Sequence, residues 1–427
     1  MARLAHNAIW VTAGQVCSVA VQAGYFVVLT QLLGAKEFGL YAVVIAIVSV
    51  VSQYANLGAG FVLLRYGSMD ESAIPVYWGN VLLALALCGL PVVVAICLYA
   101  HINLNSASLQ LVGTVSISEC ICFALVAAAA QAYQSRERMR SSAALNLANN
   151  LFRLITALGL LYWLHVTNAL VWARSVLLCS TAVAVASYVA VTRSFGAPRF
   201  EPRLLFKRAG EGMSFSLSLS TSALYNDLDK ILLGRYGLLV ATGIYTAAYR
   251  VLNAATMPAY AIYSSAFPRF FRLGAEGAEQ TAKLARRLLA YTSPVLLLGA
   301  AGLYATAPYI AKAFGKGFSE TGDALRLLCL IPFIRGVQWS AGDAISGLGE
   351  QRLRLILQAV AVIINLLLNL HYIPIYSWRG AAWVTLATDG SLAVMMWAAL
   401  YVLLYRKRRR TSDAGSSQGL LDELESE

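Results

Sequence analysis

The chain has 427 residues, of which 59% are hydrophobic and only 13% are charged, and its mean hydropathy is +0.65. A soluble domain carries about 25% charged residues, so this composition excludes a soluble globular protein and indicates a polytopic membrane protein. The formal net charge is +12, but nearly all Lys and Arg lie in short connections between apolar runs or in the cluster 406–410. That placement is a signal of membrane topology and argues against a nucleic-acid partner.

Apolar runs recur along the whole chain, each with about 20 residues or more, which is the length that crosses a bilayer as a helix. This pattern predicts an all-α membrane protein with about 12 transmembrane helices. The runs lie at 6–33, 39–64, 78–100, 109–134, 141–164, 168–192, 211–233, 240–268, 288–313, 321–348, 353–375 and 380–405.

The distribution of basic residues supports this count. With alternating connections, 22 Lys and Arg fall on one side of the membrane and five on the other. Cytoplasmic connections carry the excess of Lys and Arg, so we expect cytoplasmic N- and C-termini.

The chain is predicted to divide at its longest basic connection. We expect an N-terminal six-helix bundle at 1–192, a cytoplasmic linker at 193–210, a C-terminal six-helix bundle at 211–405, and a basic then acidic disordered cytoplasmic tail at 406–427. The two bundles echo each other, as in transporters built from parallel repeats. The clearest echo is Leu32-Leu33-Gly34 followed by Gly39-Leu40-Tyr41, which recurs as Leu232-Leu233-Gly234 followed by Gly243-Ile244-Tyr245.

Several charged residues fall inside the predicted spans, where each costs roughly 2.5–3.5 kcal/mol at the centre of a helix. Such residues either pair across helices or line a polar cavity, and five of them near the midplane favour the cavity. The midplane set is Glu119, Arg153, Arg250, Arg335 and Asp389; nearer the outer face are Arg174, Asp227, Asp229 and Lys230, and nearer the inner face is Asp343.

The sign of the midplane charge points to the substrate. Three arginines stand against two acids there. Arginine stays protonated and binds phosphate through two parallel hydrogen bonds, so the excess predicts an anionic, phosphate-bearing substrate. The acids can pair with arginine or titrate and drive ion coupling. The cysteines and histidines show no metal-ligand spacing, so neither a metal site nor a catalytic residue is expected.

One stretch resembles a known family. Asn226-Asp227-x-Asp229-Lys230-x-x-Leu233-Gly234, followed by Gly243-Ile244-Tyr245-x-Ala247-x-x-Arg250, is similar to the start of the second half in bacterial polysaccharide-biosynthesis exporters. These are the Wzx-type O-antigen and exopolysaccharide flippases of the multidrug/oligosaccharidyl-lipid/polysaccharide (MOP) superfamily. The resemblance implies two six-helix bundles around a central cavity.

The resemblance also implies a function. Such a protein moves undecaprenyl-diphosphate-linked oligosaccharide across the bacterial inner membrane for lipopolysaccharide O-antigen, capsule or exopolysaccharide. It works by alternating access, without a bound cofactor, and draws on a proton or sodium gradient. Its expected partners are the lipid-linked substrate, membrane lipids and polysaccharide assembly proteins.

Roles for the embedded charges follow from this function. We expect Arg153, Arg250 and Arg335 to bind the diphosphate, with Arg174 and Lys230 assisting near the exit. Ion coupling or gating is assigned to the acids Asp229, Asp227, Glu119, Asp389 and Asp343.

Two other functions remain open at this stage. A drug or metabolite antiporter of the MOP superfamily has the same helix count, but the family's drug exporters more often have an acidic or neutral pocket. A membrane enzyme of polysaccharide assembly needs a sizeable outer loop, whereas the outer connections here are short. We therefore expect a transporter and not an enzyme.

Overall fold

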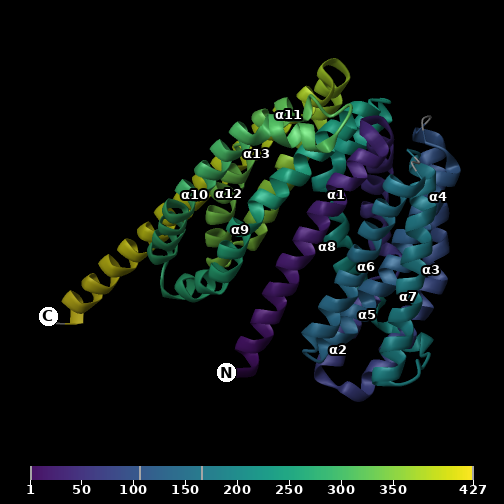
Figure 1. The fold of residues 1–427 in the computed structure, drawn as a ribbon. Helices are drawn as coiled ribbons and strands as arrows, with labels where there is room; N and C mark the ends of the chain where they lie inside the picture. Colours follow the sequence, from purple (N-terminus) through teal and green to yellow (C-terminus); the bar gives the residue numbers. More distant parts are fainter. Residues whose placement is uncertain (1, 105–106, 165–166, 426–427) are drawn as a thin grey trace. The chain divides into compact units, whose positions relative to one another are not determined.

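The computed structural model describes residues 2–104, 107–164 and 167–425, and all regular structure within these ranges is helical (Figure 1). The first part of the chain comprises α1 (Ala2–Val51), η1 (Ser52–Tyr54), α2 (Ala59–Met69), η2 (Glu71–Ala73), α3 (Ile74–Asn103), α4 (Leu109–Ile117), η3 (Ser118–Phe123), α5 (Ala124–Ser135), α6 (Met139–Gly159), η4 (Leu160–Leu164), α7 (Ala169–Phe195) and α8 (Pro202–Arg235). The remainder comprises α9 (Leu239–Glu276), α10 (Ala278–Phe314), α11 (Thr321–Leu328), α12 (Ile331–Gly347) and α13 (Gln351–Glu425).

Two of these helices extend over more than one predicted span: α1 covers 6–33 and the first part of 39–64, and α13 covers 353–375 and 380–405. The helix α1 breaks at Gly34, where φ is 67° and ψ is 172°, and α13 breaks at Ser377, where φ is 56°. By length and composition, seven helices in the described part of the chain can cross a membrane, and Val21–Tyr54 and Gln351–Arg406 are among them. The predicted all-α, multi-pass membrane fold is confirmed, whereas the central cavity implied by the resemblance stays a prediction.

The chain forms two compact units, which comprise residues 1–246 with 311–320, and residues 247–310 with 321–427. These limits differ from the predicted bundles at 1–192 and 211–405, because α8 and the start of α9 pack within the first unit. The linker is also shorter than the predicted 193–210, since α7 ends at Phe195 and α8 begins at Pro202. The six-helix division itself stays a prediction.

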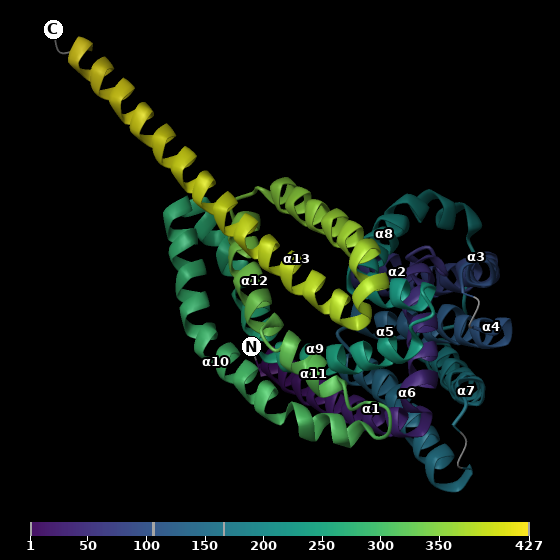
Figure 2. The same cartoon turned by 90° about the horizontal axis from the view of Figure 1, so that it is seen from above.

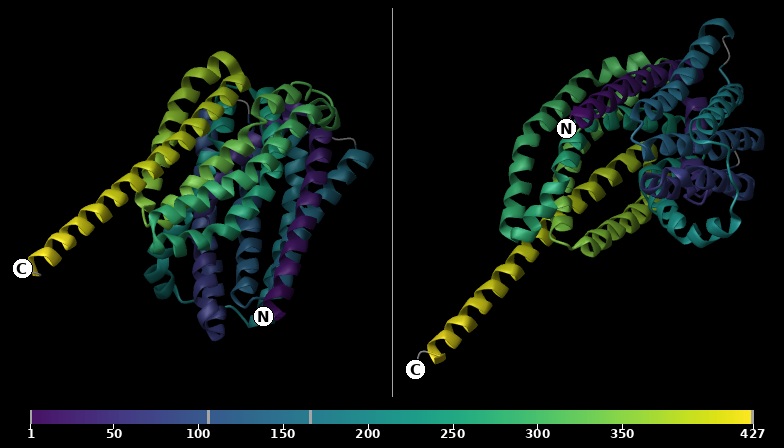
Figure 3. Two further views of the ribbon diagram at one scale, coloured as in Figure 1. Left: turned by 90° about the vertical axis from the view of Figure 1, so that its left-hand side faces the viewer. Right: turned by 90° about the horizontal axis from the view of Figure 1, so that it is seen from below.

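The prediction of a disordered tail at 406–427 is wrong within the described residues, because α13 is helical as far as Glu425 (Figures 2 and 3). A helix that is already formed extends without the cost of a new nucleus. Leu, Arg, Lys and Glu are strong helix formers, and no proline interrupts the sequence after 405. The acidic composition alone therefore did not decide the local structure.

The repeated glycine motifs meet each other within the first unit. A methyl group at Gly39 of α1 would lie 1.8 Å from the carbonyl oxygen of Leu239, and one at Gly243 of α9 would lie 2.2 Å from that of Ala35. Likewise, a methyl group at Gly234 would lie 2.3 Å from the side chain of Val43. The backbones approach so closely that only glycine fits, which explains why both halves carry the motif.

A strap formed by residues 311–320 also belongs to the first unit, although the residues on either side of it belong to the second. Phe314 contacts Phe26 of α1 and Phe318 contacts Phe38, with ring centroids 5.4 and 5.9 Å apart. The Nε2 group of Gln31 donates a hydrogen bond to the carbonyl oxygen of Ala313 at 2.8 Å. Phe318 is fully buried. The strap is therefore held on α1 mainly by aromatic packing.

The second unit has its own apolar core, in which Phe270 of α9, Ile345 of α12 and Leu400 of α13 pack together. Pro294 and Pro308 lie inside α10, which curves along its length (Figure 2). Proline removes a backbone hydrogen bond and bends a helix, so the curvature has a local cause.

Candidate functional site

Glu119 and Arg153 form an ion pair inside the first unit. Glu119 lies in the π-helical turn η3, and π-helical turns within longer helices occur frequently at functional sites. The Nη2 atom of Arg153, on α6, lies 2.7 Å from Oε1 of Glu119, and the two side chains are 15% and 17% exposed. The guanidinium carbon also lies 5.8 Å from the ring centroid of Phe123. Two residues predicted to have separate roles therefore share one site.

Aromatic side chains surround this pair. Tyr41 and Tyr25 of α1 are close enough to the Arg153 guanidinium to interact with it electrostatically. Both tyrosine rings contact Trp172 of α7, with centroids 6.4 and 5.8 Å apart, and Trp172 is fully buried. The ion pair therefore sits among aromatic groups with little access to water, where an uncompensated charge is costly.

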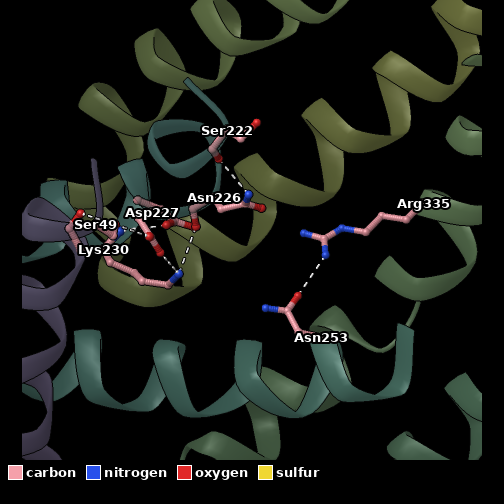
Figure 4. A network of polar contacts seen from close by, with 9 residues as sticks. Ser49, Ser222, Asn226, Asp227, Lys230, Asn253 and Arg335 are labelled. Atoms are coloured by element: carbon pink, nitrogen blue, oxygen red, sulfur yellow. Dashed lines mark hydrogen bonds and ion pairs between the residues drawn. The ribbon is translucent and has the colours of Figure 1, made fainter. Parts of the chain in front are cut away.

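Lys230 is also paired within the first unit. Its Nζ atom lies 2.5 Å from Oδ1 of Asp227 and donates to the carbonyl oxygen of Asn226 at 3.0 Å. From α1, the hydroxyl of Ser49 donates to the other oxygen of Asp227 at 2.9 Å (Figure 4). Asp229 is buried beside them and accepts a hydrogen bond from the backbone N–H of Lys230. The cluster holds two carboxylates and one ammonium group, so its formal net charge is negative.

Arg335 lies in the second unit, on α12. Its Nη1 group donates to Oδ1 of Asn253 at 3.0 Å (Figure 4), and its Nε atom lies 3.9 Å from Oδ2 of Asp389. Its guanidinium carbon lies 5.8 Å from the ring centroid of Tyr249. Asp389 is 3% exposed, and its backbone carbonyl accepts a hydrogen bond from Gln338. The Arg335 guanidinium therefore contacts a carboxylate, an amide and an aromatic ring.

A chain of polar side chains ends at Thr388, which directly precedes Asp389 in the sequence. The amide of Asn365 donates to the Thr388 hydroxyl, and the amide of Asn369 donates to Oδ1 of Asn365, both at 2.9 Å. Asn369 is fully buried, and its Oδ1 atom has no hydrogen-bond partner in the described part of the chain. A buried acceptor of this kind is usually satisfied by a partner such as an ordered water or an ion.

The other predicted residues differ in their surroundings. Asp343 is buried and pairs with Arg354, whose Nη1 atom lies 3.0 Å from Oδ1. Arg174 is exposed and donates to Oε1 of Gln110 at 3.2 Å. Arg250 is exposed, and no carboxylate of the described residues pairs with it. Arg250 is therefore the predicted phosphate ligand that the protein itself engages least.

Sequence reasoning missed three partners of these charges: Ser49, Asn253 and Arg354. Each lies far along the chain from its contact or on a neighbouring helix. Neither hydropathy nor residue spacing predicts contacts between residues placed in this way. The sequence analysis placed Asp343 near the inner face, but it gave no indication that Arg354 is its partner.

The family can be read from the sequence itself. A family model described as polysaccharide biosynthesis protein matches residues 4–274, which is well over half of the chain. The chain belongs to the polysaccharide biosynthesis protein family. This confirms the predicted resemblance, and the match includes Glu119, Arg153 and Lys230. No curated protein matches the sequence.

Solved structures show the fold of this polysaccharide biosynthesis family member to be that of the MOP superfamily. An inward-facing multidrug resistance MATE family transporter has a TM-score of 0.72 at 13% identity, with 92% of this chain and 96% of that chain covered. The lipid II flippase MurJ, in an inward closed conformation, has a TM-score of 0.69 at 12% identity, with 92% and 87% covered. A MOP superfamily transporter from Pyrococcus furiosus has 0.60 at 13% identity, with 94% and 95% covered.

These relatives differ in what their descriptions state. One is a multidrug transporter, one is a lipid II flippase, and the Pyrococcus furiosus protein is described as having a binding pocket of reverse polarity. At such low identity the similarity establishes the fold alone. The substrate must be argued from this chain's own charges.

Proposed function

We propose that this protein flips undecaprenyl-diphosphate-linked oligosaccharide from the cytoplasmic to the periplasmic leaflet of the bacterial inner membrane. The proposal rests on three arginines within the predicted spans of a polysaccharide biosynthesis family member: Arg153, Arg250 and Arg335. Embedded charge is retained where it has a partner or a function, and a diphosphate is an anion that an arginine fork binds well.

The three arginines differ in how readily they would accept the diphosphate. Arg250 is exposed and needs no rearrangement. Arg335 contacts a neutral amide, and its carboxylate partner lies 3.9 Å away, so an incoming anion displaces that carboxylate more easily than one in a close ion pair. Arg153 is bound to Glu119 at 2.7 Å, so a diphosphate must displace this carboxylate. Arg174, which is exposed, and Lys230 are proposed to assist near the exit.

Ion coupling is proposed to act through the acids. When a proton binds Glu119, its charge is lost and Arg153 is freed for the diphosphate, so proton uptake and anion binding favour each other. Further candidates to bind a proton or sodium ion are Asp227 and Asp229 of the negatively charged cluster around Lys230, together with Asp389 and Asp343. Alternating access between the two leaflets completes the proposed cycle.

The product of this step would feed surface glycan assembly. The proposal assigns the oligosaccharide to O-antigen, capsule or exopolysaccharide, and it assigns polysaccharide assembly proteins as downstream partners.

Tyr249, which lies beside Arg335, is 5% exposed, so it supports the arginine and offers little surface to a sugar.

A drug or metabolite antiporter is the second candidate, because the fold resembles that of a multidrug resistance transporter. Cationic drugs need an acidic or aromatic pocket, and an excess of arginine repels them. The flippase is therefore the better account of the three embedded arginines.

The test is made in the native organism after deletion of the gene, with variants returned on a plasmid at matched membrane levels. The triple variant Arg153→Gln, Arg250→Gln, Arg335→Gln should abolish surface glycan and cause lipid-linked oligosaccharide to accumulate. Arg326→Gln removes an exposed arginine that lies over the Tyr304 ring, and it should leave both unchanged. Normal surface glycan in the triple variant, or changed resistance to cationic compounds alone in the deletion strain, would contradict the proposal.

A further inference from the structure

An aromatic pair lies close to Arg335 in the second unit. Trp339 follows Arg335 by four residues on α12, so the two side chains lie on the same side of that helix. The Trp339 ring packs edge-on against the ring of Tyr260 on α9, with centroids 5.5 Å apart and an angle of 64° between the rings. Tyr260 is 60% exposed, so the protein's own packing leaves most of this side chain uncovered.

A second tyrosine holds Trp339 from its buried side. The ring of Tyr263 lies 5.8 Å from that of Trp339, measured between centroids. Tyr263 is itself buried, and its hydroxyl shares a hydrogen bond of 2.8 Å with the hydroxyl of Thr292 on α10. Trp339 is therefore packed between a fixed buried ring and an exposed one. A side chain that is already held in place loses little conformational entropy when a ligand binds.

Tyr260 shares a face of α9 with two polar residues of the candidate site. Arg250, Asn253 and Tyr260 are all exposed, and with 3.6 residues per turn they lie within about 80° of one another around the helix axis. A charged side chain in a membrane span faces a polar cavity or a partner and not the hydrocarbon of the bilayer. The exposed ring of Tyr260 therefore belongs to a polar face, where a lipid chain is not the expected neighbour.

The aromatic pair lies one to two helical turns from the contact between Arg335 and Asn253. That contact is a hydrogen bond of 3.0 Å (Figure 4). Trp339 lies about 6 Å further along α12 than Arg335, and Tyr260 lies about 10 Å further along α9 than Asn253. With cytoplasmic termini, the predicted spans 240–268 and 321–348 both run toward the cytoplasm. A diphosphate on Arg335 would therefore have the aromatic pair beside it, on the side from which a cytoplasmic substrate enters.

We propose that Tyr260 and Trp339 form a sugar-binding platform, which packs against the first sugar of the diphosphate-linked glycan. A sugar ring presents apolar C–H groups on its faces and hydroxyls at its edge, so it can cover an aromatic ring while its hydroxyls contact polar groups. The hydroxyl of Ser264, one turn beyond Tyr260, donates to the Tyr260 carbonyl oxygen at 2.7 Å. Its oxygen therefore remains available to accept from a sugar hydroxyl.

This inference rests on the proposed transport of a diphosphate-linked glycan, to which it adds the part of the site that recognises sugar. The test measures dissociation constants of the detergent-purified full-length protein for undecaprenyl diphosphate with and without one N-acetylglucosamine. The wild-type protein should bind the sugar-bearing lipid about fivefold more tightly.

The variants separate sugar binding from diphosphate binding. Trp339→Leu and Tyr260→Leu should each reduce the preference to less than about twofold, with an unchanged affinity for undecaprenyl diphosphate. Trp339→Phe keeps a ring and should keep most of the preference. Arg335→Gln should weaken the binding of both lipids by a similar factor. Tyr309→Leu removes a tyrosine of α10 that is 71% exposed, and it should leave both constants unchanged.

The possible failures can be told apart. Equal affinity of the wild-type protein for the two lipids would overturn the platform and leave the proposed function standing, whereas binding of neither lipid would contradict both. A preference that persists in Trp339→Leu and in Tyr260→Leu would place the sugar elsewhere and overturn the platform. An equal loss of affinity for both lipids in these variants would also overturn it. If Trp339→Leu fails to fold, Tyr260→Leu decides alone, because it removes an exposed side chain.

Discussion

Removal of one member of the Glu119–Arg153 pair should destabilise the protein more than removal of both. The pair is 2.7 Å apart, and each side chain retains about a sixth of its exposure. Breaking a fully buried pair by losing one partner costs about 3–5 kcal/mol, because the remaining charge is uncompensated. Residual exposure to water lowers this, so we expect about 2 kcal/mol for Glu119→Gln and about 2 kcal/mol for Arg153→Met.

The double variant carries no uncompensated charge and should cost only about 1 kcal/mol. The cycle of four proteins therefore predicts an interaction energy of about 3 kcal/mol, at the upper end of measured pairs. The assay is the free energy of unfolding in mixed micelles, measured for wild type, both single variants and the double variant. A double variant whose loss equals the sum of the two single losses within about 0.5 kcal/mol would refute the pairing.

Three further predictions rest on single contacts. Gly39→Val should lower the unfolding free energy by at least about 2 kcal/mol, because its Cβ would clash with backbone. Gly24→Val meets nothing within 4 Å and should leave the unfolding free energy nearly unchanged in the same assay in mixed micelles. Phe318→Ala should lower the unfolding free energy by about 3–5 kcal/mol and speed proteolysis of the strap. The Phe271 side chain is 49% exposed, so Phe271→Ala should lower the unfolding free energy by less than about 1 kcal/mol. Arg250→Gln should reduce glycan export at least about tenfold. The melting temperature should stay unchanged, because this exposed arginine has no carboxylate partner in the described residues. A fall in melting temperature would assign Arg250 a structural role instead.

The fold could be predicted from the sequence because hydropathy and charge report directly on the membrane. Apolar runs of the length of a bilayer and the excess of basic residues on one side predicted the multi-pass helical fold. The repeated glycines also carried structural information, since Gly39 and Gly243 lie where two backbones touch. The helical tail beyond 405 was missed, because composition does not reveal whether an existing helix will continue.

The candidate site could be predicted only as a set of charges. The apolar runs placed Glu119 and Arg153 inside spans, but their pairing depends on tertiary packing that brings α6 to η3, which a single sequence does not encode locally. The π-helical turn that holds Glu119 had no signal in the sequence for the same reason. The strap at 311–320 was likewise missed, because 311–313 was predicted to end a span and 314–320 to connect it to the next.

Transport in purified proteoliposomes tests the central claim most directly. Vesicles are loaded with a fluorescent diphosphate-linked oligosaccharide in both leaflets, and a membrane-impermeant quencher of the sugar label measures exchange between them. The account predicts that the wild-type protein exposes nearly all of the label, and that the Arg153→Gln, Arg250→Gln, Arg335→Gln variant exposes only the outer half. Equal exchange by that variant, or equal exchange of a lipid-linked sugar that lacks the diphosphate, would contradict it.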